Sequence, residues 1–125
     1  MKQIPKTVAK FEQDFNALKG SDKDLMAYLM HIPPTTIEAL FKKSEIPTEA
    51  FSGILKTLAL HNYELKTDKQ WVGQFMLSLS KANNFEMTLM FAGEQDRKNI
   101  AATVAKIEKF DKPLAMKVQK SYTEE

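Results

Sequence analysis

The chain has 125 residues, of which 43% are hydrophobic and 27% are charged. This length and composition are typical of one domain with one hydrophobic core, and eight phenylalanines exclude a disordered segment. The sequence contains no cysteine, which excludes disulfide frameworks, thiolate zinc sites and a cysteine nucleophile.

The charge balance is nearly neutral. Eighteen basic and 16 acidic residues give a net charge of +2, and Arg97 is the only arginine. A chain dominated by lysine lacks the guanidinium forks that read bases, so we expect no direct nucleic-acid partner. No apolar run approaches the ~20 residues of a membrane span, and the N-terminus lacks a signal-peptide core. We therefore expect no membrane partner and a cytoplasmic location, with the nucleus as a second possibility.

Apolar residues recur at every third or fourth position, which is the helical period. This pattern predicts an all-α fold, a compact bundle or short right-handed array of about seven helices without a sheet. In chain order, the predicted helices cover residues 7–19, 22–30, 36–41, 47–62, 69–79, 85–91 and 94–108. We expect a flexible start at 1–6 and a helical domain at 7–110. Because periodicity weakens around Pro113, residues 111–125 are predicted to be a tail or a frayed C-terminal helix.

Local residue types predict where several helices begin and end. Gly20 follows the first helix, where a left-handed residue commonly ends a helix. Thr35 and Glu38 have the spacing of a capping box before the third helix, and Asp68 suits the N-cap of the fifth. The pair Asn83–Asn84 predicts a turn before the sixth helix.

Residues that could carry chemistry are sparse. His31 and His61 are the only imidazoles, and neither has a His or Cys at ligand spacing, so we interpret both as structural. Asp22 and Asp24 lie at a helix start, where carboxylates complement the helix dipole. The four glycines are isolated, so no phosphate-binding loop is present. We therefore predict no enzyme activity, no cofactor and no metal.

The predicted sixth helix carries two apolar stripes. A helix turns by about 100° per residue, so Phe85 and Leu89 share one side, while Met87, Met90 and Phe91 share the other. Either the helix is wholly buried, or the Met/Phe stripe faces outward and binds a partner. The pattern alone leaves both readings open.

Four groups of apolar residues stand in the order and spacing of a known helical domain: Phe11-x3-Phe15-x2-Leu18-Lys19, Leu25-x2-Tyr28-Leu29, Leu40-Phe41 and Leu79-Ser80-x4-Phe85-x-Met87-x2-Met90-Phe91. Over about residues 7–110 the chain resembles the C-terminal domain shared by RNA polymerase II-associated protein 3, the insect protein Spaghetti and sperm-associated antigen 1. The resemblance implies a protein-interaction domain.

The resemblance further implies a non-enzymatic adaptor of a heat-shock protein 90 co-chaperone. In that family, an N-terminal tetratricopeptide repeat region recruits heat-shock protein chaperones, and the C-terminal domain anchors the adaptor to the RuvB-like AAA+ ATPase hetero-hexamer. Together with a PIH-domain subunit, the complex assembles snoRNPs, RNA polymerases and phosphatidylinositol-kinase-like kinases. Sperm-associated antigen 1 implies a role in dynein-arm preassembly as the alternative.

The family's ATPase-binding surface lies on the helix equivalent to Phe85–Phe91, and Met87 and Phe91 match its contact positions. We expect Met90 to add apolar area, with Lys81 and Asn84 at the rim. The family can carry an arginine where Asn84 stands, so a charged contact from this position is in question. The rival reading is a basic helical nucleic-acid-binding module that uses the terminal lysines, and salt dependence discriminates the two.

Overall fold

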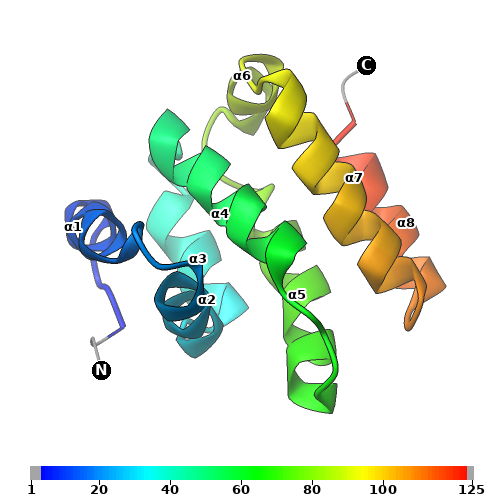
Figure 1. Ribbon diagram of the computed structural model, residues 1–125. Coiled ribbons are helices and arrows are strands. Elements are labelled where there is room, and N and C mark those ends of the chain that lie inside the picture. Colours follow the sequence, from blue (N-terminus) through cyan, green and yellow to red (C-terminus); the bar gives the residue numbers. More distant parts are fainter. Residues whose placement is uncertain (1–3, 124–125) are drawn as a thin grey trace.

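Residues 4–123 are described by the computed structural model, and within them the chain forms eight α-helices and no strand (Figure 1). The helices are α1 (Val8–Leu18), α2 (Asp22–His31), α3 (Pro34–Phe41), α4 (Thr48–Leu60), α5 (Lys66–Leu79), α6 (Phe85–Met90), α7 (Glu94–Glu108) and α8 (Lys112–Ser121). The all-α prediction is confirmed. Residues 1–3 of the expected flexible start, and 124–125 of the expected tail, lie outside the described residues.

Helices α4 and α5 form the middle of the fold. Helices α1 to α3 lie on one side of them, and α7 and α8 pack together on the other (Figure 1). Between 4 and 123, no helix is both long and apolar enough to cross a bilayer.

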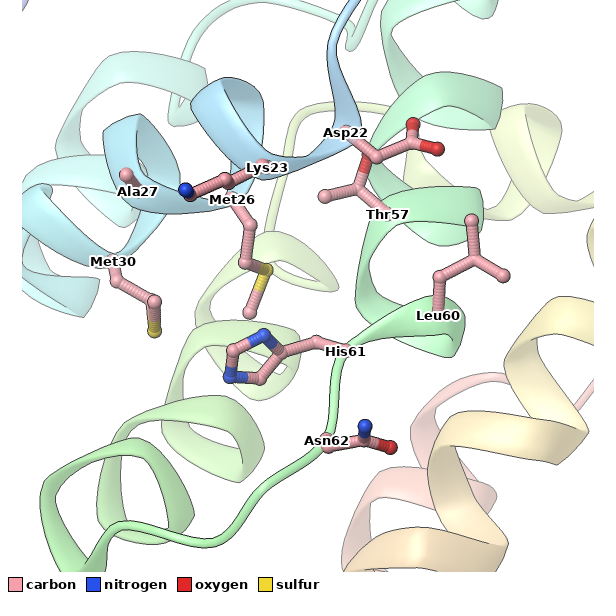
Figure 2. Close-up of a pocket in the computed structure, with 9 residues that line it drawn as sticks. All are labelled: Asp22, Lys23, Met26, Ala27, Met30, Thr57, Leu60, His61 and Asn62. Carbon is pink, nitrogen blue, oxygen red and sulfur yellow. The ribbon is translucent and has the colours of Figure 1, made fainter.

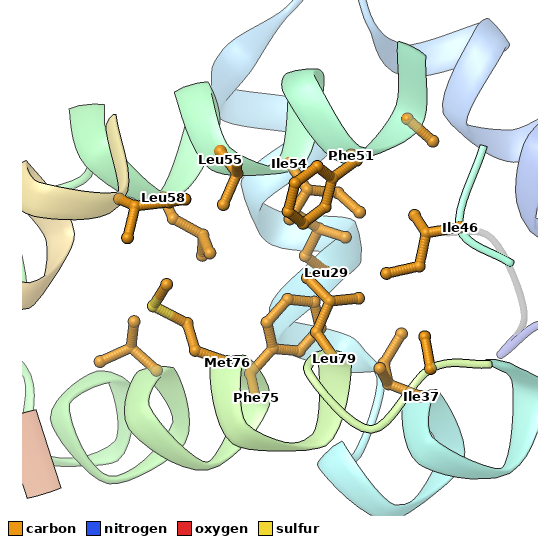
Figure 3. Close-up of a cluster of buried hydrophobic side chains, with 14 of the residues drawn as sticks. Leu29, Ile37, Ile46, Phe51, Ile54, Leu55, Leu58, Phe75, Met76 and Leu79 are labelled. Atoms are coloured by element: carbon orange, nitrogen blue, oxygen red, sulfur yellow. The ribbon is translucent and has the colours of Figure 1, made fainter. Parts of the chain in front are cut away.

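The core is built from the apolar stripes of the helices. The inward residues of α4, namely Phe51, Ile54, Leu55 and Leu58, are 0–2% exposed. In Figure 3 they face Phe75, Met76 and Leu79 of α5, with Leu29 and Ile37 closing the cluster. Each fully buried side chain of this size contributes about 1.5–3 kcal/mol relative to exposure. The stripes that the sequence predicts are therefore the residues that hold α4 against α5.

The prediction of a tail or frayed helix after residue 110 is wrong for α8. Asp111 caps the helix, since its Oδ1 accepts from the backbone N–H of Leu114 at 3.1 Å. Pro113 lies in the first turn, where no helical N–H is needed. Three inward residues at helical spacing are buried: Ala115, Val118 and Tyr122. The Tyr122 hydroxyl also donates to the carbonyl of Met76 on α5 at 2.7 Å.

Three predicted helix-capping features are also wrong. No described glycine has a positive φ, so Gly20 is not left-handed; α1 ends at Leu18, and its C-cap residue Lys19 is in the right-handed region. Helix α3 begins at Pro34 without a side-chain cap, so the predicted capping box is not its N-terminus. Helix α5 begins at Lys66, which places Asp68 in the first turn rather than at the cap. Proline at the first helical position needs no N–H partner, which explains the earlier start of α3.

Helix α4 ends at Leu60, two residues before its predicted end, because His61 is extended. Two carbonyls at its C-terminal end accept from another helix. The Lys106 amine of α7 donates to the carbonyl of Ala59 and, at 2.8 Å, to that of His61. Burial, and secondarily the nearby charge of Lys109, lower the pKa of the Lys106 amine. A lysine on α7 thus caps the C-terminus of α4.

Buried phenols link several helices. Each donates to an acceptor at short distance: Tyr28 to Asp14 Oδ2 (2.7 Å), Tyr63 to the carbonyl of Leu58 (2.8 Å) and Tyr122 to that of Met76 (2.7 Å). Burial raises the pKa of all three above the ordinary value of 10.0, and Asp14 adds to the effect on Tyr28. These tyrosines are therefore neutral donors in the folded protein at every pH near neutrality.

Candidate protein-interaction site

Helix α6 is a surface helix rather than a buried one. Phe85 and Leu89 are 7% and 4% exposed, whereas Met87, Met90 and Phe91 are 40%, 59% and 71% exposed. The sequence pattern left two readings open, and the structure decides that the Met/Phe stripe faces solvent. We refer to Met87, Met90 and Phe91 as the α6 surface. Exposed apolar side chains that adjoin one another on a helix are typical of a binding surface.

The buried face of α6 holds the helix in place. The Phe85 ring meets the rings of Phe51 and Tyr122 edge-on, at centroid distances of 5.8 Å and 5.2 Å. The Leu89 carbonyl accepts from the Arg97 guanidinium of α7 at 3.0 Å. Helix α6 is therefore anchored to α4, α7 and the end of α8, which presents its outer stripe on a fixed support.

The turn before α6 sets the direction of the helix, as the Asn83–Asn84 pair predicts. Asn84 has a φ of 57°, the only positive φ of a non-glycine residue in the described range, and asparagine tolerates this left-handed conformation. The Asn83 N–H donates to the carbonyl of Phe41 at 2.7 Å, and the Asn84 amide donates to Glu45 Oε1 at 2.8 Å. The turn is thereby tied to the end of α3 and the segment that follows it.

The two predicted rim residues are engaged within the chain. The Asn84 side chain pairs with Glu45, and the Lys81 amine lies 3.5 Å from Glu38 Oε1. Both residues are exposed and precede α6. Of the five predicted site residues, the structure thus groups Met87 and Met90 of α6 with Phe91, the C-cap residue of this helix, and places the two polar residues beside its N-terminal end.

The two histidines have ordinary surroundings. His31 ends α2, and His61 Nε2 lies 3.0 Å from Asp68 Oδ2 while its ring meets Tyr63 edge-on. His61 also lines a pocket of about 460 Å³ between α2 and the end of α4, shown in Figure 2 with the thioethers of Met26 and Met30. Among residues 4–123, no group of three His, Asp or Glu side chains could hold a metal ion.

Sequence reasoning missed two pockets because each is formed by segments far apart in the chain. The pocket of Figure 2 joins α2 to the α4–α5 connection. A second pocket lies between α6 and the end of α8, a segment that the sequence analysis predicts as a tail or a frayed helix rather than a packed one. Helical periodicity identifies a buried stripe, but it does not identify which helices meet.

An all-helical domain that presents three neighbouring exposed apolar side chains on a short, firmly held surface helix has the features of a protein-interaction domain. Residues 4–97 match the family model described as "Potential Monad-binding region of RPAP3". The chain therefore belongs to the family of RPAP3 C-terminal domains, as the resemblance in its apolar residues predicts.

Two relatives and one solved structure support this assignment. The chain is 34% identical over 96 residues to RNA polymerase II-associated protein 3 of Xenopus laevis, covering 77% of the chain and 14% of that protein. It is 32% identical over 107 residues to the Homo sapiens protein of that name, covering 85% and 16%. The NMR structure of the C-terminal domain of the human RPAP3 protein matches with a TM-score of 0.83 and 28% identity, covering 97% of this chain and 90% of that one. The chain thus spans a small part of its relatives' length.

Proposed function

We propose that this chain is the anchoring domain of a non-enzymatic co-chaperone adaptor and that its α6 surface binds a RuvB-like AAA+ ATPase. The observation that carries the proposal is the exposure of Met87, Met90 and Phe91 on a helix whose other face is buried. Phe91 stands at a position that matches the family's contact residues, and it is also the most exposed of the three. Family membership supports the choice of partner.

Apolar burial supplies the binding energy in this proposal. Interfaces depend on a few large apolar residues, and truncating such a residue costs about 2 kcal/mol or more. Methionine adapts to an irregular partner surface, while the phenylalanine ring provides a rigid anchor. Asn84 brings no charge and already donates to Glu45, so the proposal assigns no ion pair to this position.

The proposal also covers the remainder of the parent protein, outside this domain. The remainder of the parent protein recruits heat-shock protein 90 and a PIH-domain subunit, and the complex assembles snoRNPs, RNA polymerases and phosphatidylinositol-kinase-like kinases. This work takes place in the cytoplasm, with the nucleus as a second location. Dynein-arm preassembly, after the resemblance to sperm-associated antigen 1, is the alternative role for the same anchoring domain.

The test is a calorimetric titration of the domain into a purified RuvB-like hetero-hexamer. The wild type is compared with Met87→Ala/Phe91→Ala and with Leu65→Ala. Leu65 is a matched control, because it is 65% exposed and is the N-cap residue of α5, outside α6 and the residues next to it. We expect binding by the wild type and by Leu65→Ala, and loss of binding by the double variant. Circular dichroism checks that each variant is folded.

Other results would redirect the proposal. Equal binding by the double variant would remove the α6 surface from the interface. Monad, which the family description names, is titrated in parallel. If the domain binds Monad but not the ATPase, Monad takes the place of the ATPase as the proposed partner. Binding of nucleic acid that weakens steeply with salt would favour the basic module instead.

A further inference from the structure

A pocket of about 490 Å³ lies between α6 and the C-terminal end of α8. Helix α6 contributes Phe85, Glu86, Leu89 and Met90, and the end of α8 contributes Lys120 and Ser121. The volume lies within the ~300–1,000 Å³ range of clefts that receive ligands. The pocket therefore has room for a short peptide segment as well as for a single side chain.

The pocket is continuous with the α6 surface through Met90. Met90 is 59% exposed, belongs to the outer stripe and also lines the pocket. Around the helix, Glu86 lies about 40° from Met90 on the side away from Phe91, and it lines the pocket as well. A partner that covers Met87 and Phe91 can therefore also enter the pocket, because the two surfaces adjoin at Met90.

The rim of the pocket carries one charge of each sign. Glu86 comes from α6 and Lys120 from α8, and neither forms an ion pair with any residue that the structure describes. Between them, Phe85 and Leu89 provide an apolar wall. An occupant that fits this arrangement is apolar in its middle, with an acidic group toward Lys120 and a basic group toward Glu86.

We infer that this pocket is a second part of the partner-binding surface and receives an apolar segment of the same ATPase, flanked by one acidic and one basic residue. The inference rests on the proposed function. It assigns Lys120 and Ser121 of α8 to the interface, so α8 serves binding as well as the core. Binding through two adjoining parts, a convex helix stripe and a concave pocket, also fixes the orientation of the partner.

Two pairs of variants test the inference in the same calorimetric titration. Lys120→Glu reverses the rim charge, and its control, Lys117→Glu, makes the same change on an exposed α8 residue outside the pocket. Ser121→Trp fills the pocket, and Gln119→Trp is its control at an exposed α8 position outside the pocket. Reversing a rim charge should weaken binding about three- to tenfold. The filled pocket should weaken it at least as much, and both controls should bind as the wild type does.

The outcomes separate the two proposals. If both pocket variants bind like the wild type while Phe91→Ala loses binding, the pocket is not part of the interface and the proposed function stands. If the wild type does not bind the hexamer, the proposed function and the inference both fail. If Lys117→Glu and Lys120→Glu weaken binding equally, the effect is one of overall charge, and the assignment of the pocket to the interface is refuted. Thermal unfolding confirms the fold of each variant, and the charge pair decides alone if Ser121→Trp is unfolded.

Discussion

Two substitutions on α8 test whether this helix is part of the core. Val118 is fully buried, whereas Met116, two residues earlier, is 61% exposed. Val118→Ala removes two buried methyl groups and leaves a small cavity. Met116→Ala removes a larger side chain but one that lies mostly in water. Comparing the two variants therefore distinguishes the loss of a buried side chain from the loss of an exposed one on the same helix.

The expected magnitudes differ severalfold. Burial of each methylene-sized group is worth about 0.8 kcal/mol, and the cavity adds to the loss, so Val118→Ala should destabilise the domain by about 2 kcal/mol. For a domain of this size, that corresponds to a fall in Tm of about 6–10 °C. Met116→Ala should change the free energy of unfolding by less than about 0.5 kcal/mol. Urea unfolding at neutral pH, followed by circular dichroism, measures both values.

The reasoning fails if Val118→Ala unfolds at the same urea concentration as the wild type. That result would mean that α8 is frayed in solution and adds no packing energy to the domain. An equally large loss in Met116→Ala would place the core on the other side of the helix. A change in the urea dependence of the free energy, rather than in the midpoint, would indicate partial unfolding instead.

Three further variants test other contacts. An alanine Cβ at Gly53 would lie 2.4 Å from the buried Phe15 ring, so Gly53→Ala should destabilise by about 1–3 kcal/mol in urea unfolding, whereas Gly20→Ala, which meets open space, should not. Lys106→Met keeps the stem but removes the amine that caps α4, and it should cost about 1–2 kcal/mol in the same assay. The buried tyrosines keep their protons above pH 10.0, where the unfolded chain releases them, so stability should fall as pH rises through this value. Each tyrosine contributes up to about 1.4 kcal/mol per pH unit, so urea unfolding of Tyr122→Phe between pH 9 and about pH 11 should show a shallower fall. A slope identical to the wild type would contradict the burial of this phenol.

Much of the fold could be predicted because the buried apolar residues recur along the chain with the period of an α-helix. Phe51, Ile54 and Leu58 recur at spacings of three and four, and all three are buried. The packing of α8, which the sequence predicts as a tail or a frayed helix, was missed for a physical reason. Its inward stripe contains a small alanine and is flanked by lysines, so its apolar signal is weak although its packing is complete.

The sequence pattern locates the candidate site on the sixth helix, but it does not show which of the two apolar stripes faces solvent. Two apolar stripes on a six-residue helix look alike until the residues beneath them are known, and those residues, Phe51 and Tyr122, come from distant segments. The pairing of Asn84 with Glu45 is equally non-local. Residue spacing along one helix carries no information about contacts of this kind.

The hydrogen bonds from Lys106 and Tyr122 to backbone carbonyls constrain when this domain can finish folding during its synthesis on the ribosome. The carbonyls of Ala59 and His61 accept from the amine of residue 106, and the carbonyl of Met76 accepts from the hydroxyl of residue 122. Synthesis runs from the N-terminus, so the two central helices emerge long before their bonding is complete. A nascent chain that stops at residue 97, where the family match ends, has both helices but neither bridge. The final contacts of α4 and α5 can therefore form only after α8 has left the exit tunnel.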